Sequence, residues 1–170
     1  KIFGEADPTL NFQSSAAPFA GDNFTGGLTR VVGENVADGP FAINQGSLAI
    51  ADGNGGGNYD LTYVGDNLTI TPRVINLDGS RAYDATNSLA SGIFTLNNLV
   101  GGQTLTLNGT GSMADKGVGT SKPVNASGLT LADGSNGGIG TNYTLTGGSH
   151  SVDISQAALV VSGITANNKV

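Results

Sequence analysis

Apolar and polar residues alternate at period two in many short runs of this chain. Residues 61–64 and 68–71 alternate in this way, and so do residues 103–107 and 128–131. Thr lies on one side of each run and an aliphatic residue on the other, which predicts half-buried antiparallel strands. The Gly, Asn and Asp between the runs suit tight turns. We therefore expect an all-β or mostly β fold.

Helical periodicity is nearly absent, so we expect at most a short helix. The two candidates are residues 14–19, which Pro18 interrupts, and residues 85–90. Pro72 marks a boundary, because a proline cannot donate a hydrogen bond inside a central strand. It separates the run before it from a new apolar segment. We expect two small tandem domains, residues 1–72 and residues 73–170.

The two halves repeat one order of segments. Each has an apolar strand ending in Ala-Asp-Gly, a loop rich in Gly and Asn, a strand that begins with Asn-Tyr, and a closing strand. The copies lie at residues 48–53, 58–62 and 68–71, and at residues 129–134, 142–146 and 151–155. The repetition predicts two units of similar design, β-grasp-like or sandwich-like.

The starts of the units repeat as well. A basic residue, an apolar residue and an aromatic residue follow one another at Lys1 and again at Arg81, and the basic-apolar pair recurs at Lys169. We expect the chain to be an excerpt of a longer array that ends inside the first strand of a following unit. In such an array each unit folds on its own and touches only its neighbours.

The charge and the hydropathy exclude several classes of partner. The net charge is −6 and only 12% of the residues are charged, against about 25% in ordinary domains. Without a cluster of Lys and Arg, the chain has no electrostatic surface for nucleic acid or anionic lipid. No apolar run approaches the length that crosses a bilayer. We expect no nucleic acid partner and no membrane insertion.

Catalytic chemistry has few candidate residues. The chain has no Cys and one His, which excludes thiolate catalysis, disulfides, Cys zinc sites and multi-histidine metal sites. His150 precedes Asp153 by three residues, but no Gly-flanked nucleophile accompanies them. We interpret His150 as an exposed strand residue, and we expect a non-enzymatic chain with no catalytic residue, no cofactor and no metal ligand.

Two Gly-rich loops resemble ligand-binding loops. Residues 52–60 place Asp and Asn around Gly, as calcium loops do, but no bidentate Glu follows. Residues 115–123 place Lys beside Gly, but without the Gly-Lys-Ser/Thr that opens a helix in a phosphate-binding loop. We interpret both as structural hairpin loops.

Aromatic residues are few, and Trp is absent. Tyr59 and Tyr143 occupy equivalent positions of the two halves, which favours a packing role. Glycan binding by exposed aromatic residues stays open as an alternative. Asn-x-Ser/Thr sequons, which accept glycans in secreted proteins, occur at Asn23, Asn67, Asn108, Asn125 and Asn142.

At this level of detail the chain resembles two known families. The first half is similar to the MBG ("mostly beta-grasp") domain of bacterial surface proteins, and the second half to the YDG domain. The MBG resemblance is carried by residues 1–8, 28–30, 33–36, 41–43, 46–48, 58–62 and 68–72. The YDG resemblance is carried by residues 83–87, where Ala85 replaces the family's Gly, and by residues 114–124 and 142–145.

The resemblance implies a place in the repeats of large secreted adhesins, the filamentous-haemagglutinin-like exoproteins of Gram-negative bacteria. It implies stalk or extension units, secreted or at the cell surface, that space and present a binding region for cell adhesion or biofilm formation. Neither family pattern brings a catalytic residue. The partners expected are neighbouring repeat domains of the same chain. Two alternatives stay open: a carbohydrate-binding module for polysaccharide, and self-association with identical adhesin molecules through strand edges.

Overall fold

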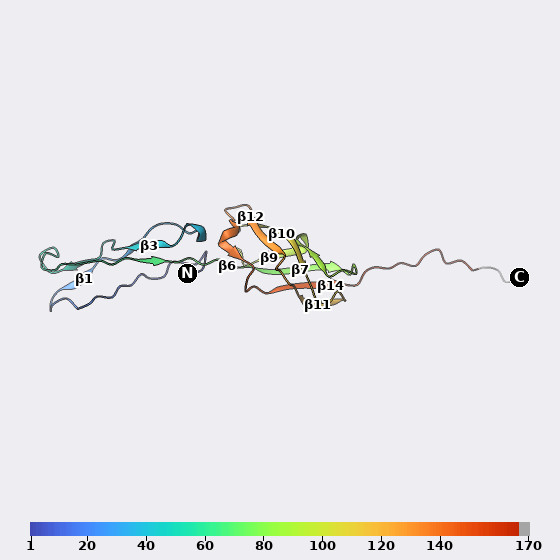
Figure 1. Ribbon diagram of the computed structural model, residues 1–170, viewed down its shortest axis with the longest axis horizontal. Coiled ribbons are helices and arrows are strands. Elements are labelled where there is room, and N and C mark those ends of the chain that lie inside the picture. Colours follow the sequence, from blue (N-terminus) through green and yellow to red (C-terminus); the bar gives the residue numbers. More distant parts are fainter. Residues whose placement is uncertain (167–170) are drawn as a thin grey trace.

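The computed structural model describes residues 1–166 and arranges them as two β-rich units in a row (Figure 1). We call residues 1–72 the N-terminal unit, residues 73–155 the C-terminal unit and residues 156–166 the tail, and we keep the boundary after Pro72 as a proposal. The tail runs away from the C-terminal unit, at the end opposite to the N-terminal unit. No helix in this part of the chain has the length and apolar character to span a bilayer.

The mostly β fold class is confirmed. Residues 1–166 contain no α-helix, and the helical turns are the short 3-10 helices η1 (Val36–Asp38), η2 (Ser91–Ile93) and η3 (Gly140–Asn142). Neither helix candidate forms: residues 14–19 have no regular structure, and Ser88–Ala90 are a strand. Pro18 breaks the first segment, and the second is drawn into a sheet by its pairing with a neighbouring strand.

The N-terminal unit has two small antiparallel sheets. One sheet has two strands and the other has three, in the order β2-β3-β5. The strands are β1 (Asn23–Thr25), β2 (Thr29–Arg30), β3 (Phe41–Asn44), β4 (Ala49–Ala51) and β5 (Asp66–Leu68), with β1 paired to β4.

The C-terminal unit has longer strands and a larger sheet. Its four-stranded sheet has the order β11-β14-β7-β9, in which β14 and β7 are parallel. A three-stranded sheet has the order β12-β10-β8, and β13 pairs with β6. The strands are β6 (Arg73–Val74), β7 (Asn76–Ala82), β8 (Ser88–Ala90), β9 (Phe94–Asn97), β10 (Leu105–Ser112), β11 (Gly119–Pro123), β12 (Leu129–Asp133), β13 (Tyr143–Thr144) and β14 (His150–Ser155).

Period-two alternation explains the core of the C-terminal unit. In β14, Val152 and Ile154 are buried, whereas Asp153 between them is exposed. Leu77 of β7 has no exposed surface. β7 has a strand on each edge, and its side chains alternate in burial, with Leu77 buried and Asp78 exposed.

Some of the expected strands are present. Residues 105–107 lie in β10, residues 129–131 in β12 and residues 151–155 in β14. Of the closing strand expected at residues 68–71, only Leu68 lies in a strand, β5. The expectations of strands at residues 58–62 and 61–64 are wrong, because no strand is present at these residues. Residues 61–64 border an open groove instead of a neighbouring strand, so their backbone has no ladder to join.

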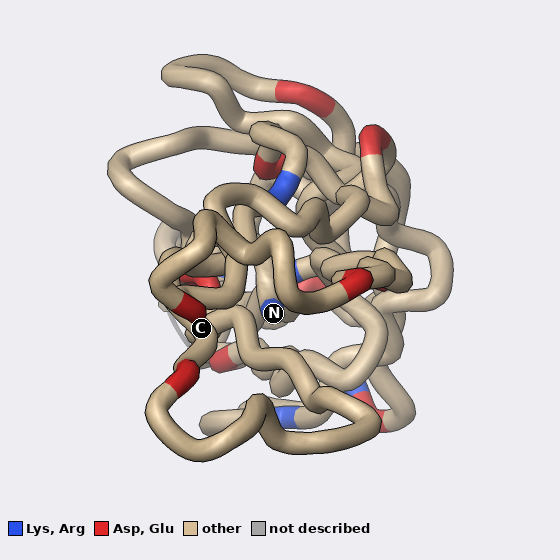
Figure 2. The backbone as a smooth tube through the Cα atoms, turned by 90° about the vertical axis from the view of Figure 1, so that its left-hand side faces the viewer, with Lys and Arg blue, Asp and Glu red and all other residues tan. Residues whose placement is uncertain are grey.

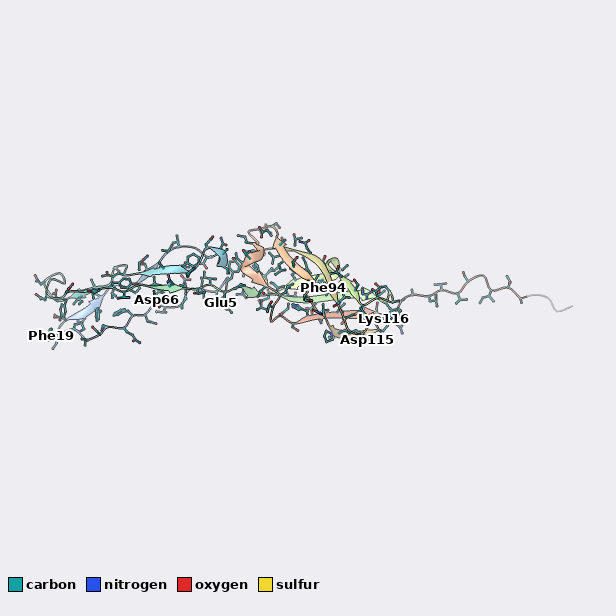
Figure 3. All side chains as sticks on the ribbon, in the orientation of Figure 1. Glu5, Phe19, Asp66, Phe94, Asp115 and Lys116 are labelled. Atoms are coloured by element: carbon teal, nitrogen blue, oxygen red, sulfur yellow. The ribbon has the colours of Figure 1, made fainter. Side chains whose placement is uncertain are left out.

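Charged residues are spread over the molecule. In the view along its long axis, Asp and Glu positions are scattered around the backbone, with a few Lys and Arg among them (Figure 2). In the side view, Asp115 and Lys116 lie at the tail end of the C-terminal unit, far from Phe19 at the outer end of the N-terminal unit (Figure 3).

Candidate functional site

The feature that could carry a function is the joint between the two units, where the short segment 69–72 connects β5 to β6. The backbone N–H of Phe3 donates to the carbonyl of Thr71 at 2.9 Å, and the N–H of Thr71 donates to the carbonyl of Lys1 at 2.9 Å. Directly after Pro72, Arg73 begins β6, which pairs with β13 of the C-terminal unit. The closing segment of one unit thus continues into the first strand of the next.

Asn142, in η3, is the buried polar residue at the centre of the joint and is only 1% exposed. Its Oδ1 accepts a hydrogen bond from the backbone N–H of Val36 at 2.8 Å, and its Nδ2 donates to Oδ1 of Asn35 at 3.0 Å. Both partners belong to the N-terminal unit. A buried amide is tolerated only when it is hydrogen-bonded, so Asn142 fixes the contact between η1 and η3 in one arrangement.

An aromatic pair packs beside Asn142. The rings of Phe3 and Tyr143 meet edge to face, with centroids 5.3 Å apart. The Tyr143 hydroxyl donates to Oε1 of Gln103 at 2.5 Å and accepts from the backbone N–H of Val100 at 3.1 Å. Gly4 has a φ of +80°, and a Cβ there would collide with Val100. The close approach of the two units therefore requires glycine at this position.

Arg73 also connects the two units through its guanidinium group. Its Nε donates to the carbonyl of Phe3 at 2.9 Å, and its Nη1 donates to Oδ1 of Asn98 at 3.1 Å. Nδ2 of Asn98 in turn donates to the carbonyl of Val74 at 2.8 Å. One guanidinium therefore links the start of the N-terminal unit to the loop after β9.

A cluster of ion pairs braces the segment that leads into η1. Nζ of Lys1 lies 2.6 Å from Asp7 and 2.5 Å from Glu34, and Nε of Arg30 lies 2.6 Å from Asp7. Arg30 also pairs with Glu34. Hydrogen bonds from Arg30 and then Lys1 lower the pKa of Asp7 to about 2, and the bond from Lys1 lowers the pKa of Glu34. These charges hold the residues just before Asn35 against the start of the chain.

Apolar packing is continuous through the joint. Phe3, Phe41 and Ile70 of the N-terminal unit belong to the same cluster of buried side chains as Ile75 and Tyr143 of the C-terminal unit. The two units of this chain therefore share one hydrophobic core.

Comparison with known families agrees with this arrangement. The model of the MBG domain (YGX type) matches residues 1–69, and the model of the YDG domain matches residues 67–152. The chain is an MBG domain followed by a YDG domain, and it belongs to these families. Both are non-catalytic, repeat-type domains of the kind found in extracellular proteins. No curated protein and no solved structure matches the chain.

The loop at residues 52–60 of the MBG unit is held by its own aspartate. The Asp52 carboxylate accepts backbone N–H bonds from Asn58 at 3.0 Å and from Gly56 and Asn54 at 2.8 Å each, and these bonds lower its pKa. The hairpin prediction for this loop is wrong, because it joins β4 to β5 and these strands lie in different sheets. Within residues 1–166, no three acidic, His or Cys side chains gather to hold a metal ion.

The Lys-Gly loop of the YDG unit also stabilises itself. Nζ of Lys122 lies 2.6 Å from Oδ2 of Asp115 and donates to the carbonyl of Gly117 at 2.7 Å. The contact with Lys122 lowers the pKa of Asp115. The hairpin prediction is wrong here too, since the loop links β10 to β11, which belong to different sheets.

His150 and Asp153 of the YDG unit do not combine into a catalytic pair. Nε2 of His150 lies 2.9 Å from the carbonyl of Leu145, whereas Asp153 accepts the backbone N–H of Ser121 at 2.7 Å. His150 is half-buried rather than exposed. Among the sequons, Asn142 is buried in the joint, so a glycan on it is incompatible with this packing.

The aromatic residues divide between core, joint and surface. Phe41 and Phe94 are core residues, and Tyr143 lies in the joint. Phe12 packs against Phe24 with centroids 5.0 Å apart and is partly exposed. Phe19 is the most exposed aromatic residue, at 81%.

Sequence reasoning missed the joint. The Asn-Tyr pair at 142–143 was visible as a repeat of the pair at 58–59, but Asn58 is exposed and its side chain bonds only to that of Asn54. Asn142, by contrast, bonds to Val36 and Asn35 of the other unit. The signal was the repeated dipeptide, but the sequence alone does not show that Asn142 faces these residues.

Proposed function

We propose that this chain is a pair of structural extension units of a large secreted or cell-surface bacterial adhesin. The units hold a binding region at a distance from the cell and present it for adhesion or biofilm formation. Their own partners are the neighbouring repeat domains of the same chain. Membership of two non-catalytic repeat families supports this role.

The observation that carries the proposal is the joint at Asn142. A flexible connection would let two units fold back, so each added unit would add little reach. Here only residues 69–72 separate β5 from β6, and the buried amide of Asn142 in one unit is hydrogen-bonded to Val36 and Asn35 of the other. Because a change of angle would leave that amide unpaired, at a cost of about 1–3 kcal/mol, the row of units stays extended.

A reach assay on a cell surface tests the proposal. One, two or three copies of the chain are placed between a membrane anchor and a peptide tag, and the cells are overlaid with a polymer layer. Capture by beads that carry an antibody to the tag should rise with each copy. Matched linkers of Gly and Ser with equal residue numbers should give less capture. Equal capture by both series would contradict a spacer function.

A second candidate function is binding of polysaccharide by the exposed aromatic residues. Phe12, Phe19 and Tyr59 all line one groove of the N-terminal unit, where Asp60 could accept hydrogen bonds from sugar hydroxyls. Saturable binding on a glycan array, removed by Phe19→Ala, would favour this function. A spacer should show no such binding.

A further inference from the structure

The chain enters and leaves the C-terminal unit on two segments that pair with each other. The segment after Pro72 forms β6 and β7, and β14 is the strand that leads into the tail. β7 and β14 are parallel and stay in register over six residue pairs, the last of which is Ala82 opposite Ser155. Before β7, β6 pairs in parallel with β13 over two further residue pairs. The entering segment is therefore held along its length by the segment that leads to the exit.

Parallel pairing decides how tension along the chain would load these strands. A pull on the chain before Arg73 acts on the N-terminal end of β7, and a pull on the chain after Ser155 acts on the C-terminal end of β14. Because the strands run the same way, these two points lie at opposite ends of the ladder. In an antiparallel pair they would lie at the same end, and the same pull would open the hydrogen bonds one after another.

The two pulls therefore slide β7 and β14 along each other, so the hydrogen bonds between them are loaded together. The direction of the strands in the molecule agrees with this load. β7 and β14 lie along the long axis, between the N-terminal unit on one side and the tail on the other (Figure 1). A pull through the two ends of the C-terminal unit thus acts along the strands and not across them.

The pair is also shielded from water. β7 and β14 are the inner strands of their sheet, since β9 pairs with the outer edge of β7 and β11 with the outer edge of β14. Leu77 and Val152 have no exposed surface, and Ile154 is 2% exposed. A hydrogen bond that is surrounded by protein is stronger than one that water can reach. The ladder under load is therefore among the best protected of the C-terminal unit.

A carboxylate fastens β7 to the strand on each side of it. The Ser151 hydroxyl of β14 donates to Oδ1 of Asp78 in β7 at 2.8 Å, and Nδ2 of Asn97 in β9 donates to Oδ2 of Asp78 at 2.8 Å. At the start of the pair, the backbone N–H of Ser149 donates to Oδ1 of Asn76 at 2.9 Å. Hydrogen bonds to a charged acceptor are among the stronger ones in proteins. These side-chain bonds therefore add to the resistance of β7 against sliding.

We propose that the β7–β14 pair is a mechanical clamp, which keeps the C-terminal unit folded while the chain is under tension. The parallel ladder, the buried side chains beneath it and the Asp78 carboxylate carry the load. This function goes beyond spacing, because a spacer needs length whereas a clamp resists a pull. A unit that unfolds at low force would still add reach in the absence of load, so the failure of one proposal does not decide the other.

Pulling single molecules of the full chain in two directions tests the proposal. The chain has no Cys, so two introduced Cys residues fix the points of attachment. Thr71→Cys with Ala157→Cys pulls the strands from opposite ends of the ladder. Ala82→Cys with Ala157→Cys pulls them from the same end, since Ala82 lies opposite Ser155. The three substituted side chains are exposed, which places the handles outside the core.

The two directions should differ in unfolding force. Neither pair of handles encloses a strand of the N-terminal unit, so the unfolding event belongs to the C-terminal unit. Forced unfolding is governed by the barrier, so at equal loading rate the force between opposite ends should be at least about twofold higher than the force at one end. Equal forces in the two directions, or a higher force at one end, would overturn the proposal.

Matched variants locate the clamp within the unit. Ser151→Ala removes the hydroxyl bond to Asp78, which lies across the β7–β14 pair. Thr106→Val removes a hydroxyl bond across β10 and β12, in which Thr106 donates to the carbonyl of Asp133 at 3.1 Å. With handles at opposite ends, Ser151→Ala should lower the unfolding force and Thr106→Val should leave it unchanged. An equal loss of force in the two variants, or a larger loss in Thr106→Val, contradicts the clamp.

Discussion

The two units follow one sequence plan but differ in their cores. All of the large, fully buried side chains belong to the C-terminal unit: Ile75, Leu77, Leu89, Asn142 and Val152. The N-terminal unit has shorter strands and an open groove. The difference coincides with β7, which contributes Leu77 and joins two other strands of its sheet. Within the described residues, the C-terminal unit therefore has the more completely buried core.

The two units also differ in the surroundings of the Asn residue in their Asn-Tyr pairs. Asn58 is exposed and makes a side-chain bond within its own loop, whereas Asn142 is buried and bonds to the preceding unit. The Asn of the same dipeptide thus lies on the surface in one unit and in the contact between the two units in the other. The following predictions test this contrast, from the largest expected effect to the smallest.

The largest effect is expected from truncating the central strand. Leu77→Ala should lower the free energy of unfolding of the C-terminal unit by about 2–5 kcal/mol, because it removes a fully buried side chain and leaves a cavity. Leu61→Ala, at a side chain that is 37% exposed, should cost well under about 2 kcal/mol. Hydrogen exchange resolved by peptide measures each unit separately. Equal losses at the two positions would refute the difference in packing.

The joint should be sensitive to Asn142 and insensitive to Asn58. Asn142→Ala leaves the Val36 N–H and Oδ1 of Asn35 without their partner, which costs about 1–3 kcal/mol. Asn58→Ala should change stability by less than about 0.5 kcal/mol. Urea unfolding monitored by tyrosine fluorescence measures both variants. The joint described here would be contradicted by an Asn142→Ala protein as stable as the wild type.

Acid should destabilise each unit through a different carboxylate. Arg30 and Lys1 lower the pKa of Asp7 to about 2, and Arg81 followed by Thr86 lowers that of Asp84 to about 2. Since both values lie below the ordinary 3.8, folding is supported above pH 3.8 and the support is lost as the pH falls toward 2.

Asp7→Asn should flatten this pH dependence in the N-terminal unit, and Asp84→Asn should flatten it in the C-terminal unit. Melting temperatures measured from pH 6 to pH 2 (about the range of both titrations), with NMR signals assigned to each unit, separate the two effects. The ion pairs would not act locally if Asp7→Asn changed the pH dependence of the C-terminal unit, or if Asp84→Asn changed that of the N-terminal unit.

The smallest effect concerns the starts of the units. Ala85 has a φ of +65°, which glycine adopts without strain and alanine does not. Ala85→Gly should therefore stabilise the C-terminal unit by about 0.5–1 kcal/mol, net of the greater freedom of glycine in the unfolded chain. Gly4→Ala should do the opposite in the N-terminal unit, because it would collide with Val100. Differential scanning calorimetry of the pair checks both signs, and destabilisation by Ala85→Gly would contradict the prediction.

The sequence pattern predicts the fold class, the repeat and many of the strands, because these follow from local alternation and turn residues. Residues 151–155 form a strand as expected, whereas residues 61–64 do not, since a strand needs a partner and the pattern does not contain one. Both Gly-rich loops looked like hairpins, yet each crosses between sheets. The joint could not be predicted, because Asn35 and Asn142 are far apart in the sequence and only the fold brings them together.

Residual dipolar couplings of the whole chain test the central claim, that the joint holds the two units as one rigid body. The backbone N–H couplings of residues 20–70 and of residues 73–155 should fit a single alignment tensor, with equal magnitude and orientation for both units. In the Asn142→Ala protein the two tensors should diverge. Different tensors in the wild-type chain would show that the units move independently, and that would contradict the account.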